Sequence, residues 1–413
     1  MTSEPSGRSR VIDVGAAYTP TEVIRPARIV IRDGRIESVA QGKPAREEGA
    51  DYHDAGDLVA APGFIDPHVH GGGGADVMDA TWDALDRISR NLARHGTTAF
   101  CPTTVSAPAA TLDSTVGKLG ELMRSSFGGA RPLGLHLEGP FISALQRGTH
   151  PADCLCRPDA AVFERWLVLS GGMLRLLTLA PELEGASSLI GLARKHGVVV
   201  GMGHSDASLE VALDAVDQGV SYAVHTFNAM RGLHHREPGM AGAVLADDRI
   251  WAEIIADGVH VAPEVVKVFA RAKGKDRVLL ATDATSATGM PDGTYMLGTR
   301  PVTVSGGVCR DAEGRLAGST LRQDLALRNY GAWSGADFAT ALLASTTNVA
   351  SALGLDDAGV IRTGARADIV LLDSGRRVVR TYVGGQCVFD RLREDPLREG
   401  PNCVSRPERR ETG

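Results

Sequence analysis

Histidine and acidic side chains follow several short apolar segments of the chain, at the point where each segment ends. These residues are His68 and His70 after the first segment, and Glu138, His204, His225 and Asp283 after later ones. His68 and His70 are two residues apart, so on an extended strand both point to the same side. Imidazole and carboxylate ligands together suit zinc, iron or another first-row metal. Because a carboxylate such as Asp283 can take a proton from water and return it to a leaving group, the pattern predicts a catalytic metal site.

Each of these residues also has an ordinary structural explanation when taken singly. An H-x-H pair is often part of a loop, and a lone histidine after an apolar segment often makes one hydrogen bond at a strand end. Glu138 could cap a turn, and Asp283, Thr282 or Ser286 could be the N-cap of a helix. The recurrence of such residues at the same end of five segments favours a shared metal site over separate coincidences.

The elements that must position these side chains are apolar segments that alternate with helix-like ones. The apolar segments are 59–65, 97–105, 132–138, 174–180, 197–203, 221–226, 251–256 and 278–282. The helix-like segments are 82–94, 109–123, 160–169, 209–218 and 263–272. Apolar strands alternating with helices indicate a parallel sheet that is buried on both faces. Eight units favour a (β/α)8 TIM-like barrel, whose active site lies at the carboxyl ends of the strands.

An open doubly wound sheet is the alternative fold, but no G-x-G-x-x-G motif follows any apolar segment. The two ends of the chain read differently from the middle, with short alternating runs and turns such as Asp33-Gly34 and Gly384-Gly385 that are typical of hairpins. We therefore expect a small β-sandwich domain assembled from residues 1–61 and 361–390. The barrel would span 62–360, and the polar residues 391–413 would form a mobile tail.

Composition excludes several classes of protein. The 413 residues are 43% hydrophobic and 23% charged, which is ordinary for a globular protein and argues against wholesale disorder. The formal net charge of −6 gives no basic field for nucleic acid, and no apolar run is long enough to span a membrane. The first residues lack the apolar stretch of a secretory signal, and six cysteines in so long a chain are not a disulfide framework. We expect a cytoplasmic protein with reduced thiols.

The remaining histidines and cysteines are interpreted as structural. His53, His95, His196 and His234, and Cys101, Cys309, Cys387 and Cys403, do not follow a strand that would aim them at the barrel mouth. Cys154 and Cys156 form a C-x-C pair in the loop after the third apolar segment, from which they could reach the mouth.

With these residues assembled, the chain resembles the amidohydrolase superfamily and, within it, the N-acetylglucosamine-6-phosphate deacetylase family. The motif PGFIDPHVHG is shared broadly across the superfamily. The more specific motifs are HLEGPF (136–141), RGTH (147–150), GHSDA (203–207), HTFNAM (225–230), REPG (236–239), DGVH (257–260), TDA (282–284) and LAGST (316–320). The resemblance covers nearly the whole chain and implies hydrolysis of N-acetylglucosamine 6-phosphate to glucosamine 6-phosphate and acetate.

The resemblance also implies roles for individual residues. Glu138, His204 and His225 would hold a tightly bound divalent metal, expected to be zinc, with iron or another first-row metal as the alternative. Family members differ at the first strand, so His68 and His70 leave open whether one or two ions are bound. Asp283 would be the general base and acid, and His150 would help to polarise the acetyl carbonyl.

Further residues would bind the substrate, an amino-sugar phosphate. The set implied by the family motifs is Thr149, His150, Asn228, Ala229, Arg236, Asp257, Gly258, Val259, His260, Leu316, Ala317 and Gly318. Arginine suits phosphate because its planar fork donates two parallel hydrogen bonds. In the family the arginine of REPG reaches the neighbouring subunit's site, which implies a homodimer with Arg236 acting across the interface.

One departure from the family motifs and several alternative functions leave the exact substrate open. Arg322-Gln323 follows the last motif where family members commonly carry Thr-Met, which leaves the acyl and epimer preference undecided. The alternative substrates are N-acetylgalactosamine 6-phosphate and another amide or cyclic imide. A remote alternative is a non-catalytic sugar-phosphate-binding protein on the same barrel.

Overall fold

Eight parallel strands form a nearly closed barrel in the structure, a computed structural model that describes residues 9–42 and 49–393. In order around the barrel they are β8 (Phe64–Val69), β11 (Thr97–Thr104), β13 (Leu135–Glu138), β14 (Leu174–Leu179), β15 (Val199–Met202), β16 (Tyr222–Ala223), β17 (Trp251–Ile254) and β18 (Val278–Leu280). The short strand β12 (Arg131–Pro132) pairs with β11. Backbone hydrogen bonds bridge β18 and β8: the N–H of His70 donates to Ala284 O at 2.8 Å, and the N–H of Asp283 donates to His68 O at 3.1 Å. The first and last strand ends therefore meet at the barrel mouth.

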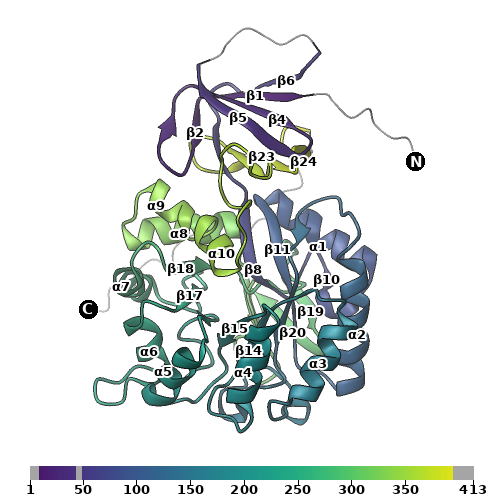
Figure 1. The fold of residues 1–413 in the computed structure, drawn as a ribbon, viewed down its shortest axis with the longest axis vertical. Coiled ribbons are helices and arrows are strands. Elements are labelled where there is room, and N and C mark those ends of the chain that lie inside the picture. The colour runs from purple at the N-terminus through teal and green to yellow at the C-terminus, as the bar shows by residue number, and fades with distance from the viewer. Residues whose placement is uncertain (1–8, 43–48, 394–413) are drawn as a thin grey trace.

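Helices cover the outside of the barrel (Figure 1). They are α1 (Trp82–Arg94), α2 (Ala109–Leu122), α3 (Ala160–Leu169), α4 (Ala186–Lys195), α5 (Leu209–Gln218), α6 (Gly239–Ala246), α7 (Pro263–Lys273), α8 (Gln323–Ser334), α9 (Phe338–Leu343) and α10 (Thr347–Ala352), with 3-10 turns at Val77–Asp79, Ala144–Gln146 and Ala152–Cys154. Their starts follow from N-caps: Thr81, Asp159 and Ser208 each accept a backbone N–H in the first turn of α1, α3 and α5. The bounds expected from the sequence for these three helices agree with the structure.

Two apolar cores meet at the barrel strands because successive side chains of a strand point to opposite sides. Phe64 belongs to the large core between strands and helices, whereas the next residue, Ile65, belongs to a core inside the barrel. Val349 and Leu353 at α10 complete the inner core. The lower part of the barrel is thus filled with side chains, which leaves the mouth for the polar residues.

A small β-sandwich stands beside the barrel and is built from both ends of the chain (Figure 1). One sheet, in order, contains β5 (Arg35–Gln41), β4 (Ala27–Arg32), β1 (Arg10–Val14) and β6 (Asp51–Asp54). The other contains β24 (Gln386–Asp390), β23 (Val378–Val383), β22 (Ile369–Leu372), β7 (Val59–Pro62), β2 (Ala16–Tyr18) and β3 (Val23–Ile24). Ile369 and Leu371 of β22 face the sandwich core, and Val370 and Leu372 face the barrel core. The predicted fold class is confirmed.

The first apolar segment expected from the sequence, 59–65, proves to span two strands. Its first part, β7, pairs with β2 and β22 in the sandwich, and its last residues begin β8 of the barrel. Gly63 joins them where no side chain fits, since a Cβ there would lie 2.2 Å from Thr98 Oγ1. A continuous apolar run concealed the junction because both strands are buried. We still propose that the chain divides near residues 62 and 361.

Two further additions to the barrel were not expected from the sequence. The short strands β9 (Gly71–Gly72) and β10 (Ala75–Asp76) form a hairpin after β8. A three-stranded antiparallel sheet of β19 (Gly293–Leu297), β20 (Arg300–Ser305) and β21 (Val308–Arg310) lies between β18 and α8. Its apolar side chains pack with Val105 and Ala317 in a core of their own.

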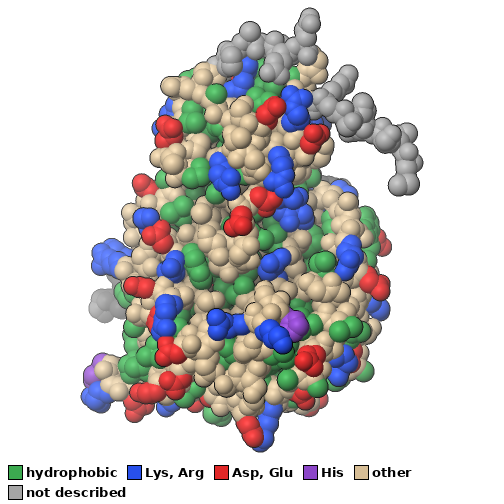
Figure 2. Space-filling view, viewed as in Figure 1, with side chains coloured by type: hydrophobic (Ala, Val, Ile, Leu, Met, Phe, Trp, Pro, Cys, Tyr) green, Lys and Arg blue, Asp and Glu red, His purple; other side chains and the backbone are tan. Residues whose placement is uncertain are grey.

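The surface, the helices and the chain ends concern the expectations about nucleic acid, membranes and a C-terminal tail. Figure 2 shows basic and acidic side chains interspersed over the visible face, with no continuous basic area on it. Among the described residues, no helix has the length and apolar character needed to cross a membrane. The expected tail from residue 394 onward, and Cys403 with it, lies outside the described residues.

Candidate metal centre and active-site cavity

Two groups of potential metal ligands lie at the carboxyl ends of the barrel strands. One group is His68, His70 and Asp283, and the other is Glu138, His204 and His225. Within each group the candidate ligand atoms lie within 4.8 Å of one another, and all six residues are buried. The strand ends named in the sequence analysis therefore meet in one place.

The Glu138 carboxylate lies between the two groups. Its Oε1 is 3.2 Å from His204 Nε2, 3.0 Å from His225 Nε2 and 3.4 Å from His68 Nε2. Its Oε2 is 3.2 Å from His70 Nε2, which is also 3.2 Å from Asp283 Oδ1. One carboxylate can thus serve both groups.

The outer ring nitrogens of the histidines are held by acceptors. The Nδ1 atoms of His70, His204 and His225 lie 3.2, 2.9 and 3.2 Å from the backbone oxygens of Thr103, Gln146 and Asn228, respectively. A carbonyl oxygen only accepts, so each Nδ1 carries a proton and each Nε2 faces the centre, where a metal would take the place of any proton on that atom. His68 is held by a side chain instead, because its Nδ1 is 3.1 Å from Glu253 Oε2. Burial lowers the pKa of His70, but its hydrogen bonds to Asp283 and Glu138 outweigh burial and raise the pKa to about 9, so a metal would bind Nε2 in place of a proton.

Three of the candidate residues have a backbone conformation that is rare for residues other than glycine. The φ angles are 47° at His204, 28° at His225 and 51° at Asp283. Such left-handed conformations are costly and cluster at functional sites. Hydrogen bonds hold two of them, since the N–H of His225 donates to Glu253 Oε2 at 3.0 Å and that of Asp283 donates to His68 O.

The charges of the two groups shift the pKa values of their members. Burial alone would raise the pKa of Asp283, but the hydrogen bond from His70 and the nearby charges of His68 and His70 hold it below its ordinary value. Burial would likewise raise the pKa of Glu138, but the charge of His68 and its hydrogen-bond partners hold it well below the ordinary value. Burial lowers the pKa of His204 to about 4, against the opposing effect of Glu138. Both carboxylates are therefore ionised at neutral pH, as ligands must be.

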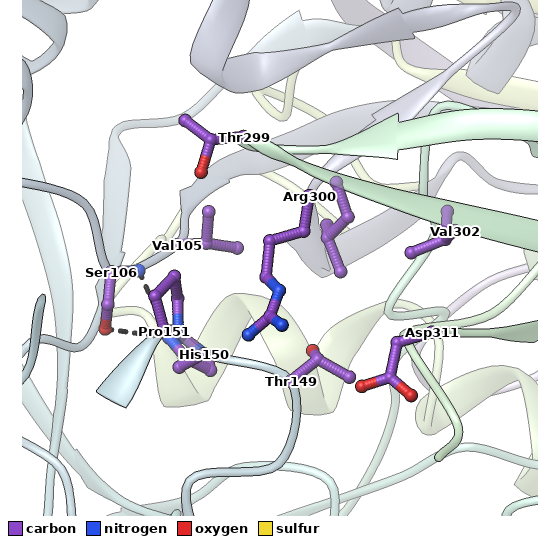
Figure 3. A pocket seen from close by; sticks show the side chains of 10 residues that line it. Val105, Ser106, Thr149, His150, Pro151, Thr299, Arg300, Val302 and Asp311 are labelled. Atoms are coloured by element: carbon purple, nitrogen blue, oxygen red, sulfur yellow. Dashed lines mark hydrogen bonds between the residues drawn. The ribbon is translucent and has the colours of Figure 1, made fainter. Parts of the chain in front are cut away.

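His150 has the opposite tautomer to the candidate ligands. The backbone N–H of Ser106 donates to His150 Nδ1 at 3.1 Å, and Ser106 Oγ lies 2.8 Å from the same atom (Figure 3). In the neutral ring the proton is then on Nε2, which is 3.5 Å from Glu138 Oε2. His150 therefore presents a hydrogen-bond donor to the centre.

A cavity of about 240 Å³ opens over the two groups. The residues that line it are His70, Val105, Glu138, Leu145, Gln146, Gly148, Thr149, His150, His204, His225, Asn228, Ala229, His260, Asp283, Leu297, Leu316 and Gly318. A side chamber with room for about one water molecule adjoins it and shares Thr149 and His150 in its wall. Figure 3 shows the Arg300 guanidinium pointing into this chamber toward Thr149.

Some residues implied by the family motifs do not line the cavity. Asp257 acts on a neighbour: its Oδ2 is 2.7 Å from His260 Nδ1. Burial lowers the pKa of His260, but this hydrogen bond outweighs it and leaves the pKa above its ordinary value. Ala317 is buried in the core of the β19–β21 sheet, and Gly258 packs against Trp333.

Two other residues implied by the motifs face solvent. Val259 is 44% exposed. Arg236 is exposed as well, and its guanidinium contacts His235 rather than the cavity.

Sequence reasoning did not find two residues that hold the site together, Glu253 and Ser106. Glu253 did leave a signal, as a lone acidic residue inside the apolar segment 251–256. Ser106 left no signal in the sequence, because only the folding of the chain brings it into contact with His150. Cys154 and Cys156 do not line the cavity. His136 is not in either ligand group: its ring nitrogens contact Thr103 and Thr178, and its ring packs edge-on against that of His68.

Comparisons with known proteins agree with this geometry. Residues 59–388 match the model of the Amidohydrolase family. The chain is 39% identical to N-acetylgalactosamine-6-phosphate deacetylase of Escherichia coli O157:H7, over 89% of this chain and 99% of that protein. It is 35% identical to N-acetylglucosamine-6-phosphate deacetylase of Bacillus subtilis, over 91% of this chain and 96% of that protein.

A solved structure gives the same result. It is a mutant N-acetyl-D-glucosamine-6-phosphate deacetylase from Mycobacterium smegmatis in complex with N-acetyl-D-glucosamine-6-phosphate. Its TM-score is 0.87 at 35% identity, and the match covers 92% of this chain and 100% of that one. The resemblance noted from the motifs is confirmed: the chain belongs to the amidohydrolase family, as a hydrolase of amide bonds that groups with the amino-sugar-6-phosphate deacetylases.

Proposed function

We propose that this protein hydrolyses the acetamide of N-acetylglucosamine 6-phosphate, giving glucosamine 6-phosphate and acetate. The observation that carries the proposal is the pair of ligand groups joined by Glu138 on the floor of a cavity that also contains His260. His260 would contact the phosphate, and the two ligand groups would hold the metal that acts on the amide, within the same cavity. The deacetylases of similar sequence named above support the same reading.

The residues present fit a divalent metal, because imidazole Nε2 atoms, whose rings are held at Nδ1, converge with ionised carboxylates. Glu138, His204 and His225 would hold one ion, and His68, His70 and Asp283 would hold a second. We propose zinc as the ion, with iron or another first-row metal as the alternative. A bound ion of this kind supplies a Lewis acid that lowers the pKa of water and polarises a carbonyl.

Asp283 and His150 would carry the proton transfers. Asp283 Oδ1 accepts a proton from water as the water oxygen bonds to the acetyl carbon, which the low pKa of this carboxyl group allows. The Nε2–H of His150 donates to the carbonyl oxygen, where negative charge develops. As the C–N bond breaks, Asp283 returns the proton to the sugar nitrogen, so that an amine leaves rather than its anion.

The phosphate would bind at the far side of the cavity. His260, whose pKa Asp257 raises, and the backbone N–H of Ala229 are the donors that we propose there, and the N–H of Asn228, which donates to His225 O at 2.9 Å, would be shared with the phosphate. Ala229 has a φ of 48°, part of the sharp turn after His225. We further propose a cytoplasmic homodimer in which Arg236 of one subunit completes the phosphate site of the other.

The test is acetate release by the purified, metal-loaded protein. We expect release from N-acetylglucosamine 6-phosphate and little from N-acetylglucosamine, because only the first engages His260. Metal content measured on the same sample shows whether the ligand groups are filled. No release from fully loaded protein would refute the proposed substrate, and equal release from both sugars would refute the phosphate site.

A second candidate substrate is N-acetylgalactosamine 6-phosphate, the 4-epimer. It is favoured by the 39% identity to the deacetylase named for that sugar, which is similar to the 40% identity to the N-acetylglucosamine-6-phosphate deacetylase of Vibrio furnissii. The same assay with both epimers decides between them. A higher kcat/KM for the galacto sugar would replace the first proposal.

A further inference from the structure

We propose that Glu253 is a positioning residue that fixes His68 as a ligand of the second metal group, which rests on the two-ion site of the proposed function. Glu253 lies on β17 and its side chain is completely buried. Its Oε2 is 3.1 Å from His68 Nδ1 and accepts the N–H of His225 at 3.0 Å. Its Oε1 accepts the hydroxyl of Tyr222 at 2.7 Å.

Glu253 is a carboxylate beside an apolar core, so we infer that its hydrogen bonds are the reason for its presence there. The inner barrel core beside it contains Cys101, Tyr222 and Leu279. An apolar side chain is ordinary at an inward-facing position of a barrel strand, and a buried carboxylate is costly unless its oxygens are paired. All the partners that pair it here are polar groups at or near strand ends, two of which belong to candidate ligands.

His68 differs from the other histidines of the two groups in what holds its outer nitrogen. His70, His204 and His225 are held by backbone oxygens, which no substitution removes. His68 is held by the Glu253 carboxylate, an acceptor that keeps the proton on Nδ1 and leaves the Nε2 lone pair for a metal. The orientation of His68 therefore depends on one other side chain.

The same carboxylate oxygen joins the two groups. By accepting the N–H of His225, Glu253 Oε2 also supports the backbone at a residue with a φ of 28°. The contact with His68 is to a side chain that can turn, whereas the contact with His225 is one of several that fix its turn. We therefore expect loss of Glu253 to affect the second group more than the first.

The experiment titrates metal-free protein with Zn²⁺ and Co²⁺ and measures stoichiometry, affinity and the visible absorption of bound cobalt. Glu253→Leu removes both acceptors, and Glu253→Gln keeps an oxygen but removes the charge. We expect the second ion to bind about 10- to 100-fold more weakly in Glu253→Leu, with Glu253→Gln near the lower end, and the first ion to change only a few-fold. Tyr222→Phe is the matched control, because it removes one buried hydrogen bond of Glu253 without touching either histidine.

A second readout needs no metal and no activity. In protein labelled with ¹⁵N-histidine, the Nδ1–H of His68 bonded to a carboxylate should give a downfield proton resonance, identified by its absence in His68→Ala. We expect Glu253→Leu to lose this resonance and Tyr222→Phe to keep it. If Glu253→Leu does not fold, as judged by thermal unfolding, Glu253→Gln decides by its affinity for the second ion.

Three results would overturn the proposal. They are a wild-type protein that binds only one ion, a folded Glu253→Leu with unchanged affinity for the second ion, and a His68 resonance that survives in that variant. Failure of the proposed function is separate, because it appears as absent acetate release from wild-type protein whose two ions are bound.

Discussion

The role of each histidine in this site depends on which of its ring nitrogens carries the proton. The outer nitrogens of His70, His204 and His225 face backbone oxygens, so their inner nitrogens are free to bind. His150 faces the N–H of Ser106, so its inner nitrogen carries a proton and can donate. Imidazole rings in the same site therefore present different groups to its centre. The difference is set by their hydrogen-bond partners and not by the residue type.

The Asp283→Asn variant tests the proton transfers at this scale. An amide cannot accept the proton of water, so we expect kcat for acetate release to fall by about 10²- to 10⁴-fold. The ion of the Glu138 group should stay bound, since that group does not need Asp283. Kinetics and metal analysis on one sample measure both, with the exposed Asp83→Asn on α1 as control. Turnover near the wild-type level would rule out Asp283 as the base.

At the scale of elements, the loop after β21 contacts the backbone of Asp283 and fixes its position. Gly318 has a φ of 56°, and a Cβ there would lie 2.9 Å from the backbone oxygen of Asp283 and 2.6 Å from Thr285 Cγ2. The next residue, Ser319, donates its N–H to that same oxygen at 2.7 Å. The glycine is thus required by the close approach of this loop to the strand end that carries Asp283.

We expect Gly318→Ala to lower kcat strongly, because it displaces Asp283. A misplacement of about 1 Å can cost on the order of 100-fold in rate. Gly314→Ala is the matched control, since Gly314 also has a positive φ, 81°, but a Cβ there meets nothing within 4 Å. Both variants bear the backbone strain, so equal kcat values in the two would show that Gly318 does not position Asp283.

A pH-dependent contact links α1 to α8. Burial lowers the pKa of His95, the C-cap residue of α1, to about 4, although Asp324 of α8 lies 3.6 Å from its Nδ1. The unfolded chain has a histidine pKa of about 6.5 and so takes up the proton first as the pH falls. The contribution of the neutral His95 ring to the free energy of unfolding is therefore complete above about pH 6.5 and is lost as the pH falls from there to about 4.

The His95→Gln variant should remove this dependence. Denaturant unfolding at a series of pH values should show a slope smaller by up to about 1.4 kcal/mol per pH unit between pH 6.5 and 4. His196→Gln, at the exposed C-cap of α4, serves as the control and should leave the slope unchanged. An unchanged slope in His95→Gln would contradict the burial of a neutral ring.

At the scale of the whole molecule, the proposed dimer can be tested by mixing subunits. Arg236 is exposed, contacts His235 and does not line the cavity of its own chain, so we expect any role in phosphate binding to require a second chain. We expect Arg236→Ala to raise KM by about tenfold or more, since a charge-assisted bond to phosphate is lost. At low substrate concentration, both this variant and Asp283→Asn should be nearly inactive.

Exchange of subunits between the two variants should restore activity. A mixed dimer has one site with an intact Asp283 and an intact partner Arg236, so about a quarter of all sites recover in a statistical mixture. Asp283→Asn mixed with the double variant Asp283→Asn, Arg236→Ala should recover none. Absence of recovery despite demonstrated subunit exchange would place Arg236 outside the partner's site.

Much of the fold could be predicted because local patterns carry it. The bounds of α1, α3 and α5 follow from N-caps and apolar spacing, and the barrel follows from alternation of strands and helices. The division of the apolar segment 59–65 between two strands at Gly63, and the sheet β19–β21, could not be predicted in this way. The first lies inside one apolar run, and the strands β19 and β20 of the second lack such a run, because exposed residues interrupt their buried ones.

The sequence by itself determined the types of the candidate metal ligands and their places at strand ends, because a parallel barrel brings all such ends to one mouth. Only the tertiary structure decided which ligands group together, that Glu138 lies between the groups, and which tautomer each histidine holds. Those features rest on contacts such as His68 with Glu253 and His150 with Ser106, whose partners are 185 and 44 residues apart in the chain. Periodicity and spacing describe neighbours within a segment, whereas the chemistry of a buried side chain is set by the distant groups that closure of the barrel brings against it.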